Sequence, residues 1–101
     1  MTNVTPGNFT LTNEQRQFKD MLDRYPRLLT YWDFEKREVK LQSIEQDISA
    51  MSRTEQIMLR FFVGVWCHNN KLDLDFTDLA GYLDKDNLQV IIDWLQKPVW
   101  P

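Results

Sequence analysis

The sequence predicts a mainly α-helical, single-domain protein, and three observations lead to this prediction. Apolar residues recur at the i, i+3, i+4 and i+7 spacing of a helix face, and Ser, Thr or Asp precedes most of these stretches. The 101 residues suffice for one modest core. A composition of 43% hydrophobic and 27% charged residues is typical of a folded globular chain. We expect a compact domain of four to five helices over residues 11–101.

The chain is expected to begin with a flexible arm over residues 1–10, since Thr, Asn, Pro and Gly in this segment favour turns and fraying. Thr12 followed by Gln15 is a capping box, which predicts a helix over about 13–24. Pro26 ends that helix, because proline disfavours helical geometry at the residue before it.

The stretch LLTYWDFEKREVKLQ fits two structures. Its aromatic and β-branched residues favour a short β-hairpin near 29–41 with its turn at Lys36 and Arg37, although that turn has neither Gly nor Asn. A helix over 27–36 that uses Pro26 as its first residue fits nearly as well. Both alternatives stay open from the sequence.

The aromatic residues Tyr31, Trp32 and Phe34 in this stretch also fit two roles. Beside four cations they could form a stacking platform for single-stranded nucleic acid. Buried, they would be core residues. Three acidic residues interleave with the cations and cancel the field that such a platform needs, which favours the core. Tyr31 and Trp32 remain candidate partner-binding residues.

Two further capping boxes, Ser43 with Gln46 and Ser52 with Glu55, predict the starts of the next two helices. The second of these helices, at about 53–68, is apolar around most of its circumference. This is typical of a helix that the rest of the domain surrounds. We therefore expect it to be the centre of the core.

Gly64 lies in the middle of this central helix, where glycine costs about 1 kcal/mol relative to alanine. Glycine at such a position lets another helix approach closely, and we therefore expect a second helix to pack against Gly64. Asn69 and Asn70 follow, and we expect them to end the helix in left-handed geometry.

The last part of the chain predicts two short helices in succession. Asp75 or Thr77 caps the first, and Asp84 caps the second. Pro98 stops the second helix. The apolar residues expected on its buried face are Leu88, Ile91, Ile92 and Leu95.

This helix pair, with Leu79 and Ala80 in its first member, resembles a DNA-binding helix-turn-helix, which implies a DNA-binding regulator as one alternative function. Asn87 and Gln89 lie where such a motif reads bases, and both can pair with adenine. However, residues 72–98 contain six acidic and two basic side chains and no Arg. Because phosphate contacts need clustered cations, DNA is the less favoured partner.

Negative charge is concentrated in the second half of the chain. The net charge is −3, and residues 55–101 hold seven acidic and four basic side chains. Aspartates at helix starts are explained by capping, but several others are surplus to that role. We therefore predict an acidic face that binds a partner protein with a basic surface. Its candidate residues are Asp73, Asp75, Asp78, Asp84 and Asp86.

Catalytic and metal-binding patterns are sparse. Cys67 and His68 are the only Cys and His, and as neighbours on a helix they point about 100° apart, which is poor geometry for a nucleophile and its base. The aspartates from 73 onward lack the Gly and the bidentate Glu of a calcium loop. We expect a non-enzymatic protein without a metal or cofactor.

The chain ends in an apolar tail. Trp100 either folds back over the core, which is favoured, or is exposed as a docking residue, so it too is a candidate for partner binding. The first ten residues have no basic and apolar leader and no apolar run is long enough for a membrane span, so we expect a cytoplasmic protein.

The second half, from SRTEQIMLRFFVGVW to LDKDNLQVIIDWLQKPVWP, resembles a set of small uncharacterised accessory proteins encoded on bacterial plasmids and prophages. These combine a long apolar helix, an acidic helix pair and a Trp-Pro end. The resemblance implies a bacterial accessory role as an adaptor, inhibitor or regulator of a mobile element, and it identifies no active-site residue.

Overall fold

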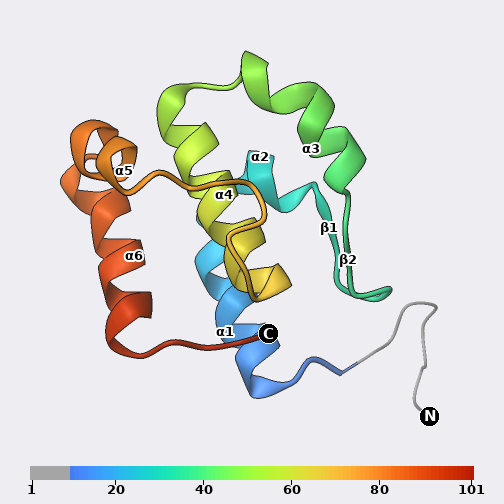
Figure 1. Cartoon of the computed structure of the whole chain (residues 1–101). Coiled ribbons are helices and arrows are strands. Elements are labelled where there is room, and N and C mark those ends of the chain that lie inside the picture. Colours follow the sequence, from blue (N-terminus) through green and yellow to red (C-terminus); the bar gives the residue numbers. More distant parts are fainter. Residues whose placement is uncertain (1–9) are drawn as a thin grey trace, which may run out of the picture.

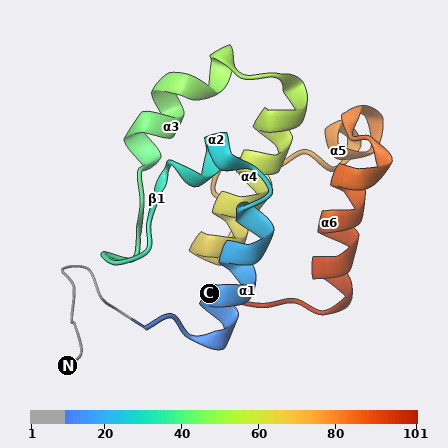
Figure 2. The same ribbon diagram turned by 180° about the vertical axis from the view of Figure 1, so that it is seen from behind.

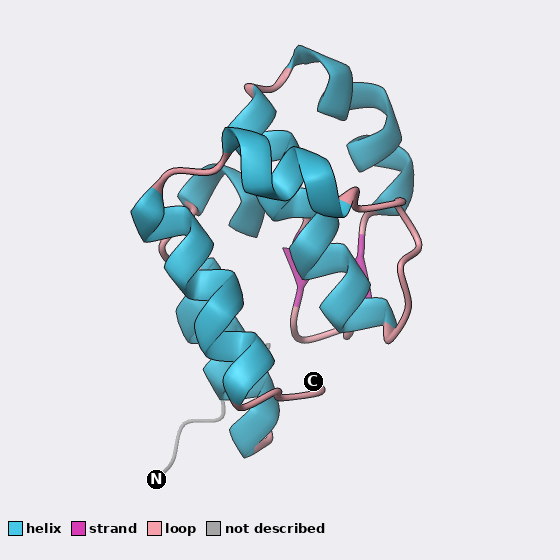
Figure 3. Cartoon of the chain, turned by 60° about the vertical axis from the view of Figure 1, so that its left-hand side comes forward, coloured by secondary structure: helices cyan, strands magenta, loops and turns pink. Residues whose placement is uncertain are grey.

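The computed structural model describes residues 10–101, so the arm expected at 1–10 lies almost wholly outside the described residues. The mainly helical fold class is confirmed, with six α-helices and one hairpin in the described part (Figures 1 and 3). In chain order the elements are α1 (Asn13–Leu22), α2 (Pro26–Leu29), β1 (Trp32–Asp33), β2 (Glu38–Val39), α3 (Leu41–Asp47), the 3-10 turn η1 (Ile48–Ala50), α4 (Arg53–Cys67), α5 (Phe76–Tyr82) and α6 (Lys85–Gln96).

Helix α4 is the centre of the core, as predicted. In Figures 1 and 2, α1 runs beside it, α6 lies to one side and α3 to the other. The ring centroids of Phe18 on α1 and Phe62 on α4 are 5.8 Å apart, and Trp94 on α6 lies 5.6 Å from Phe61. Seven residues of α4 are buried: Ile57, Met58, Leu59, Phe61, Phe62, Val63 and Val65.

Local capping chemistry fixes where α1 and α4 begin. The predicted boxes at Thr12 and Ser52 are both formed, with each hydroxyl oxygen accepting from the backbone N–H three residues on, at 3.0 and 3.1 Å. Helix α1 ends at Leu22, two residues earlier than expected, because the chain tightens into i→i−3 bonds before Pro26.

The predicted capping box at Ser43 and Gln46 was wrong. Helix α3 begins at Leu41, so Ser43 lies inside its first turn, and the N-cap residue Lys40 caps through no side-chain bond. The backbone explains the earlier start, because the carbonyl of Lys40 accepts the N–H of Ile44 at 3.1 Å.

The stretch after Pro26 combines the two alternatives. Pro26 is the first residue of the single turn α2, and a hairpin follows with Trp32 paired to Val39. The hairpin turn contains Arg37, whose φ of 56° is the left-handed value that Gly or Asn adopts most easily. This geometry could not be predicted from the residues of the turn, since arginine rarely adopts it.

The hairpin aromatics belong to the core. Tyr31, Trp32 and Phe34 are 8%, 6% and 8% exposed, so the candidate contacts at Tyr31 and Trp32 are not available on the surface. The indole N–H of Trp32 is buried without a hydrogen-bond partner in the described part of the chain. The hydroxyl of Tyr31 donates to Asp47 at 2.5 Å.

The end of α4 differs from the prediction. His68, not Asn69 or Asn70, adopts the left-handed conformation, with φ 59°. The N–H of Asn69 then donates to the carbonyl of Gly64 at 3.0 Å, which closes a Schellman-type cap. A Cβ at Gly64 would lie 3.1 Å from the carbonyl oxygen of Asn69. Gly64 therefore makes room for the chain's own turn and not for another helix.

Helix α6 is rotated relative to the prediction. Its buried residues are Val90 and Ile91, whereas Leu95, expected on the buried face, is 61% exposed. Trp94 packs against the core in its place. Because the indole ring offers more apolar surface than leucine, facing Trp94 toward Phe61 buries more area.

Candidate functional site

The five candidate aspartates lie around α5, and three of them have local structural roles. Asp75 caps α5, and its carboxylate accepts the N–H groups of Thr77 and Asp78 at 2.8 and 3.1 Å. The Thr77 hydroxyl also donates to it, and these hydrogen bonds lower the pKa of Asp75. Asp84 caps α6 by accepting the N–H of Asn87 at 3.0 Å.

Arg53 holds α5 against the start of α4. Its guanidinium lies 3.6 Å from the carboxylate of Asp78 and 4.7 Å from the ring centroid of Tyr82. A cation over an aromatic face adds about 0.5–1 kcal/mol at an exposed site. Asp78, the third aspartate with a local role, is therefore part of a contact that orients α5.

The remaining two, Asp73 and Asp86, are exposed and make no side-chain hydrogen bond or ion pair within residues 10–101. Asp73 has φ 55°, so it lies in a tight turn before α5, and Asp86 lies in the first turn of α6 just after it. The carboxylates of Asp73 and Asp86 are therefore the two among the five that neither cap a helix nor form an ion pair within residues 10–101.

Two aromatic side chains of α5 face solvent. Phe76 is 80% exposed and Tyr82 is 55% exposed, while Leu79 between them packs against the core. Phe76 lies three residues before Leu79 and Tyr82 three residues after it, so the two exposed rings flank the side of the short helix that meets the core. Phe76 could not be singled out from the sequence, because the apolar stripe of this helix gives no sign of which of its members reach the core. We call Asp73, Asp75, Phe76, Asp78 and Tyr82 the α5 surface.

The α5–α6 pair has the order of a helix-turn-helix, but its amide side chains are engaged within the protein. The phenol of Tyr25 donates to the side-chain oxygen of Asn87 at 2.5 Å, and the Asn87 amide donates to Asp84 at 2.8 Å. Gln89 donates to Asp93 at 2.7 Å. Both residues that would read adenine are thus paired with other groups of this chain.

The C-terminal tail folds back over the domain. The indole of Trp94 donates to the carbonyl of Val99 at 3.0 Å, and the backbone N–H of Trp100 donates to Glu14 at 2.8 Å. Trp100 is 46% exposed and lies edge-on to Trp94 and to His68. The tail is therefore packed, but one part of the Trp100 ring stays open to solvent.

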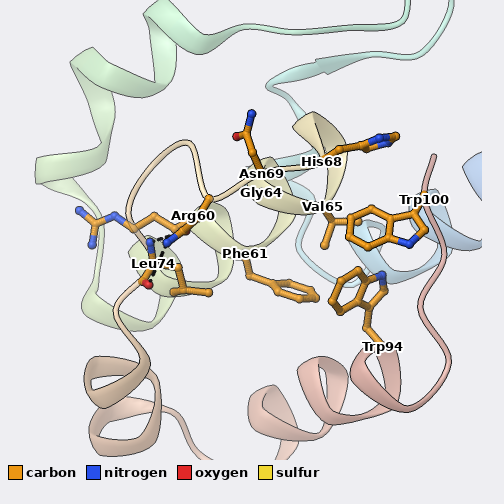
Figure 4. Close-up of a pocket in the computed structure, with 10 residues that line it drawn as sticks. Arg60, Phe61, Gly64, Val65, His68, Asn69, Leu74, Trp94 and Trp100 are labelled. Atoms are coloured by element: carbon orange, nitrogen blue, oxygen red, sulfur yellow. Dashed lines mark hydrogen bonds between the residues drawn. The ribbon is translucent and has the colours of Figure 1, made fainter.

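An apolar groove of about 220 Å³ lies between α4, the loop after it, α6 and this tail (Figure 4). Figure 4 shows Trp94 and Trp100 at one end and the Arg60 side chain at the other, with Phe61 and Leu74 between them. We call this the tail groove.

Cys67 and His68 have different surroundings. Burial raises the pKa of the Cys67 thiol, with an opposing effect of Lys71, and a thiol is a weak nucleophile compared with a thiolate. The Nε2 of His68 lies 3.2 Å from the carbonyl oxygen of Pro101. Within residues 10–101, no three Asp, Glu, His or Cys side chains lie close enough together to hold a metal ion.

Comparison with family models, with curated proteins and with solved structures gave no match to this chain. Across residues 10–101, none of the helices has the length and apolar character needed to span a membrane.

Proposed function

We propose that this chain acts without catalysis, by binding another protein through the α5 surface. The exposure of Phe76, 80% of its surface, is the observation that carries the proposal. Fully burying such a ring is worth about 1.5–3 kcal/mol, a gain that the isolated chain forgoes. Aromatic residues are enriched at the buried centres of protein interfaces.

The charges that precede and follow α5 define the partner. Asp73 precedes α5 and Asp86 follows it, and neither is neutralised within the described chain. The fitting partner has an apolar pocket for Phe76, with Lys or Arg at its rim. Such rim charges mainly speed association and make it sensitive to salt.

DNA is the alternative partner, because α5 and α6 follow each other as the helices of a helix-turn-helix do. The internal hydrogen bonds of Asn87 and Gln89 and the six acidic residues among positions 72–98 weigh against it. The resemblance to mobile-element proteins adds the expectation of a bacterial, cytoplasmic partner for an adaptor, inhibitor or regulator.

The test is affinity capture from a lysate of the native host, with and without nuclease, by the parent chain and three variants. Phe76→Ser removes the ring and should weaken capture of a specific protein about 10- to 100-fold. The double variant Asp73→Asn with Asp86→Asn should slow association at low salt. Leu95→Ser is the matched control, because Leu95 is also exposed but lies near the other end of α6.

A captured protein whose retention survives Phe76→Ser, or falls equally with Leu95→Ser, would remove the α5 surface from the function. Retention that disappears with nuclease would favour the DNA alternative.

A further inference from the structure

Arg60 is an anomaly among the six arginines of the chain. The other five are exposed, whereas Arg60 is partly buried. Its Nε atom is buried without a hydrogen-bond partner, and its guanidinium is in none of the ion pairs of residues 10–101. Residues 1–9 contain no acidic side chain. A partly buried cation without a counter-ion costs free energy, which an anion bound beside it would offset.

The surroundings of Arg60 indicate the rest of the ligand. It lines one end of the tail groove, whose other walls are mostly apolar: Phe61, Val65, Leu74, Trp94 and Trp100. In Figure 4 the guanidinium and the two indoles are at opposite ends. A molecule that uses both must be elongated, with an apolar ring at one end and an anionic group at the other.

The volume of the tail groove limits the size of the ligand. At about 220 Å³ the groove is smaller than the roughly 300–1,000 Å³ of pockets for drug-sized ligands, so it holds one ring system with a short chain. The planar guanidinium matches a carboxylate in two parallel hydrogen bonds, and an aromatic ring can pack edge-to-face on Trp94 and Trp100.

We infer that the tail groove binds a small aryl-alkyl carboxylate, with its carboxylate on Arg60 and its ring against Trp94 and Trp100. This inference is independent of the α5 surface, because none of the residues of that surface lines the groove. Ligand binding in the tail groove can be tested on the isolated chain, without a partner protein.

The test uses 4-phenylbutyrate and its uncharged counterpart 4-phenyl-1-butanol. Both are titrated into ¹⁵N-labelled full chain while the four tryptophan indole N–H signals are followed by NMR. We expect the signals of Trp94 and Trp100 to shift, those of the core residues Trp32 and Trp66 to stay, and the acid to bind at least tenfold more tightly than the alcohol.

Arg60→Met should abolish this preference, so that acid and alcohol bind alike, while Arg60→Lys should keep part of it, since lysine retains the charge but not the planar fork. Arg24→Met is the matched control, because Arg24 is an arginine that does not line the groove. Trp100→Ala, at a half-exposed position, should weaken the binding of the acid and of the alcohol equally. This variant tests the groove if Arg60→Met does not fold.

The inference is overturned if millimolar acid shifts neither Trp94 nor Trp100, if acid and alcohol bind the parent chain alike, or if the preference survives in Arg60→Met. Loss of the preference in Arg24→Met would also overturn it, because the attraction would then be a general charge effect.

Discussion

The phenol of Tyr25 donates a hydrogen bond of 2.5 Å to the side-chain oxygen of Asn87, which joins the residue before α2 to the first turn of α6. The two residues are 62 positions apart, so this bond fixes how the last helix lies on the domain. It also pairs, with a group of the same chain, an amide that a DNA-binding helix would present to a base.

Tyr25→Phe tests the structural value of this bond. The variant keeps the ring, which packs 5.5 Å from Phe62, and removes only the hydroxyl. A net hydrogen bond of this kind is worth about 1 kcal/mol, and we expect the free energy of unfolding in urea to fall by that amount. An unchanged urea midpoint would show that the contact does not hold α6.

Phe62→Ala tests the placement of the core. Phe62 has no exposed surface and lies edge-on to Phe18, so truncation leaves a cavity in the centre of the domain. We expect a loss of about 3–5 kcal/mol in the free energy of unfolding, measured by thermal or chemical denaturation. Leu95→Ala, at a surface position, should stay within about 0.5 kcal/mol of the parent. Similar losses for the two would contradict the assignment of core and surface.

The hairpin turn offers a test of backbone strain. Arg37 has φ 56°, which costs a non-glycine residue about 1–2 kcal/mol. Glycine removes this strain but loses more freedom on folding, so Arg37→Gly should raise the free energy of unfolding by about 0.5 kcal/mol. Arg37→Val should lower it, because a β-branched residue fits this geometry worst. The reverse order of the two variants would show that the turn is not formed as described.

Alkaline pH should destabilise the fold through Tyr31. Burial, and then the hydrogen bond to Asp47, raises the pKa of the Tyr31 phenol above its ordinary value of about 10. The folded state thus favours the neutral phenol. Its contribution is fully present below about pH 10 and is lost as the pH rises through the raised pKa.

The measurement is the free energy of unfolding at pH 8 and at pH 11 for the parent chain and for Tyr31→Phe. The variant lacks the titrating group, so its stability should fall less between the two pH values. An equal fall in both proteins would assign the alkaline sensitivity to other groups.

Most features that depend on neighbouring residues could be predicted from the sequence, although the capping box expected at Ser43 and Gln46 did not form. The caps at Thr12, Ser52 and Asp84 each need only a side chain and the N–H groups two or three positions on, and they formed as expected. The apolar circumference of α4 likewise predicted its central position.

Features that depend on distant residues could not be predicted. Trp94 and Leu95 both fit a helical stripe, and the choice between them follows from Phe61 and Val99, which α6 meets only in the folded chain. The partial burial of Arg60 at the tail groove is also a tertiary effect, because an arginine in a helix ordinarily predicts a solvent-facing position.

The candidate site shows the same division. The sequence predicted the aspartates around α5, and three of them, including Asp75 and Asp78, serve caps or an ion pair. It did not reveal the exposure of Phe76. That exposure arises because Phe76 is the first residue of α5, while Leu79 one turn later reaches the core.

Site-specific photo-crosslinking in the native host tests the central claim, binding through the α5 surface, most directly. A benzoylphenylalanine at position 76 replaces one exposed aromatic ring with another, and the same group at position 95 probes an exposed site about 15 Å from the first residue of α6, near its other end. We predict one discrete protein adduct from position 76 that is absent from position 95 and weakened by Asp73→Asn with Asp86→Asn. No protein adduct from position 76, or the same adduct from both positions, would contradict the claim.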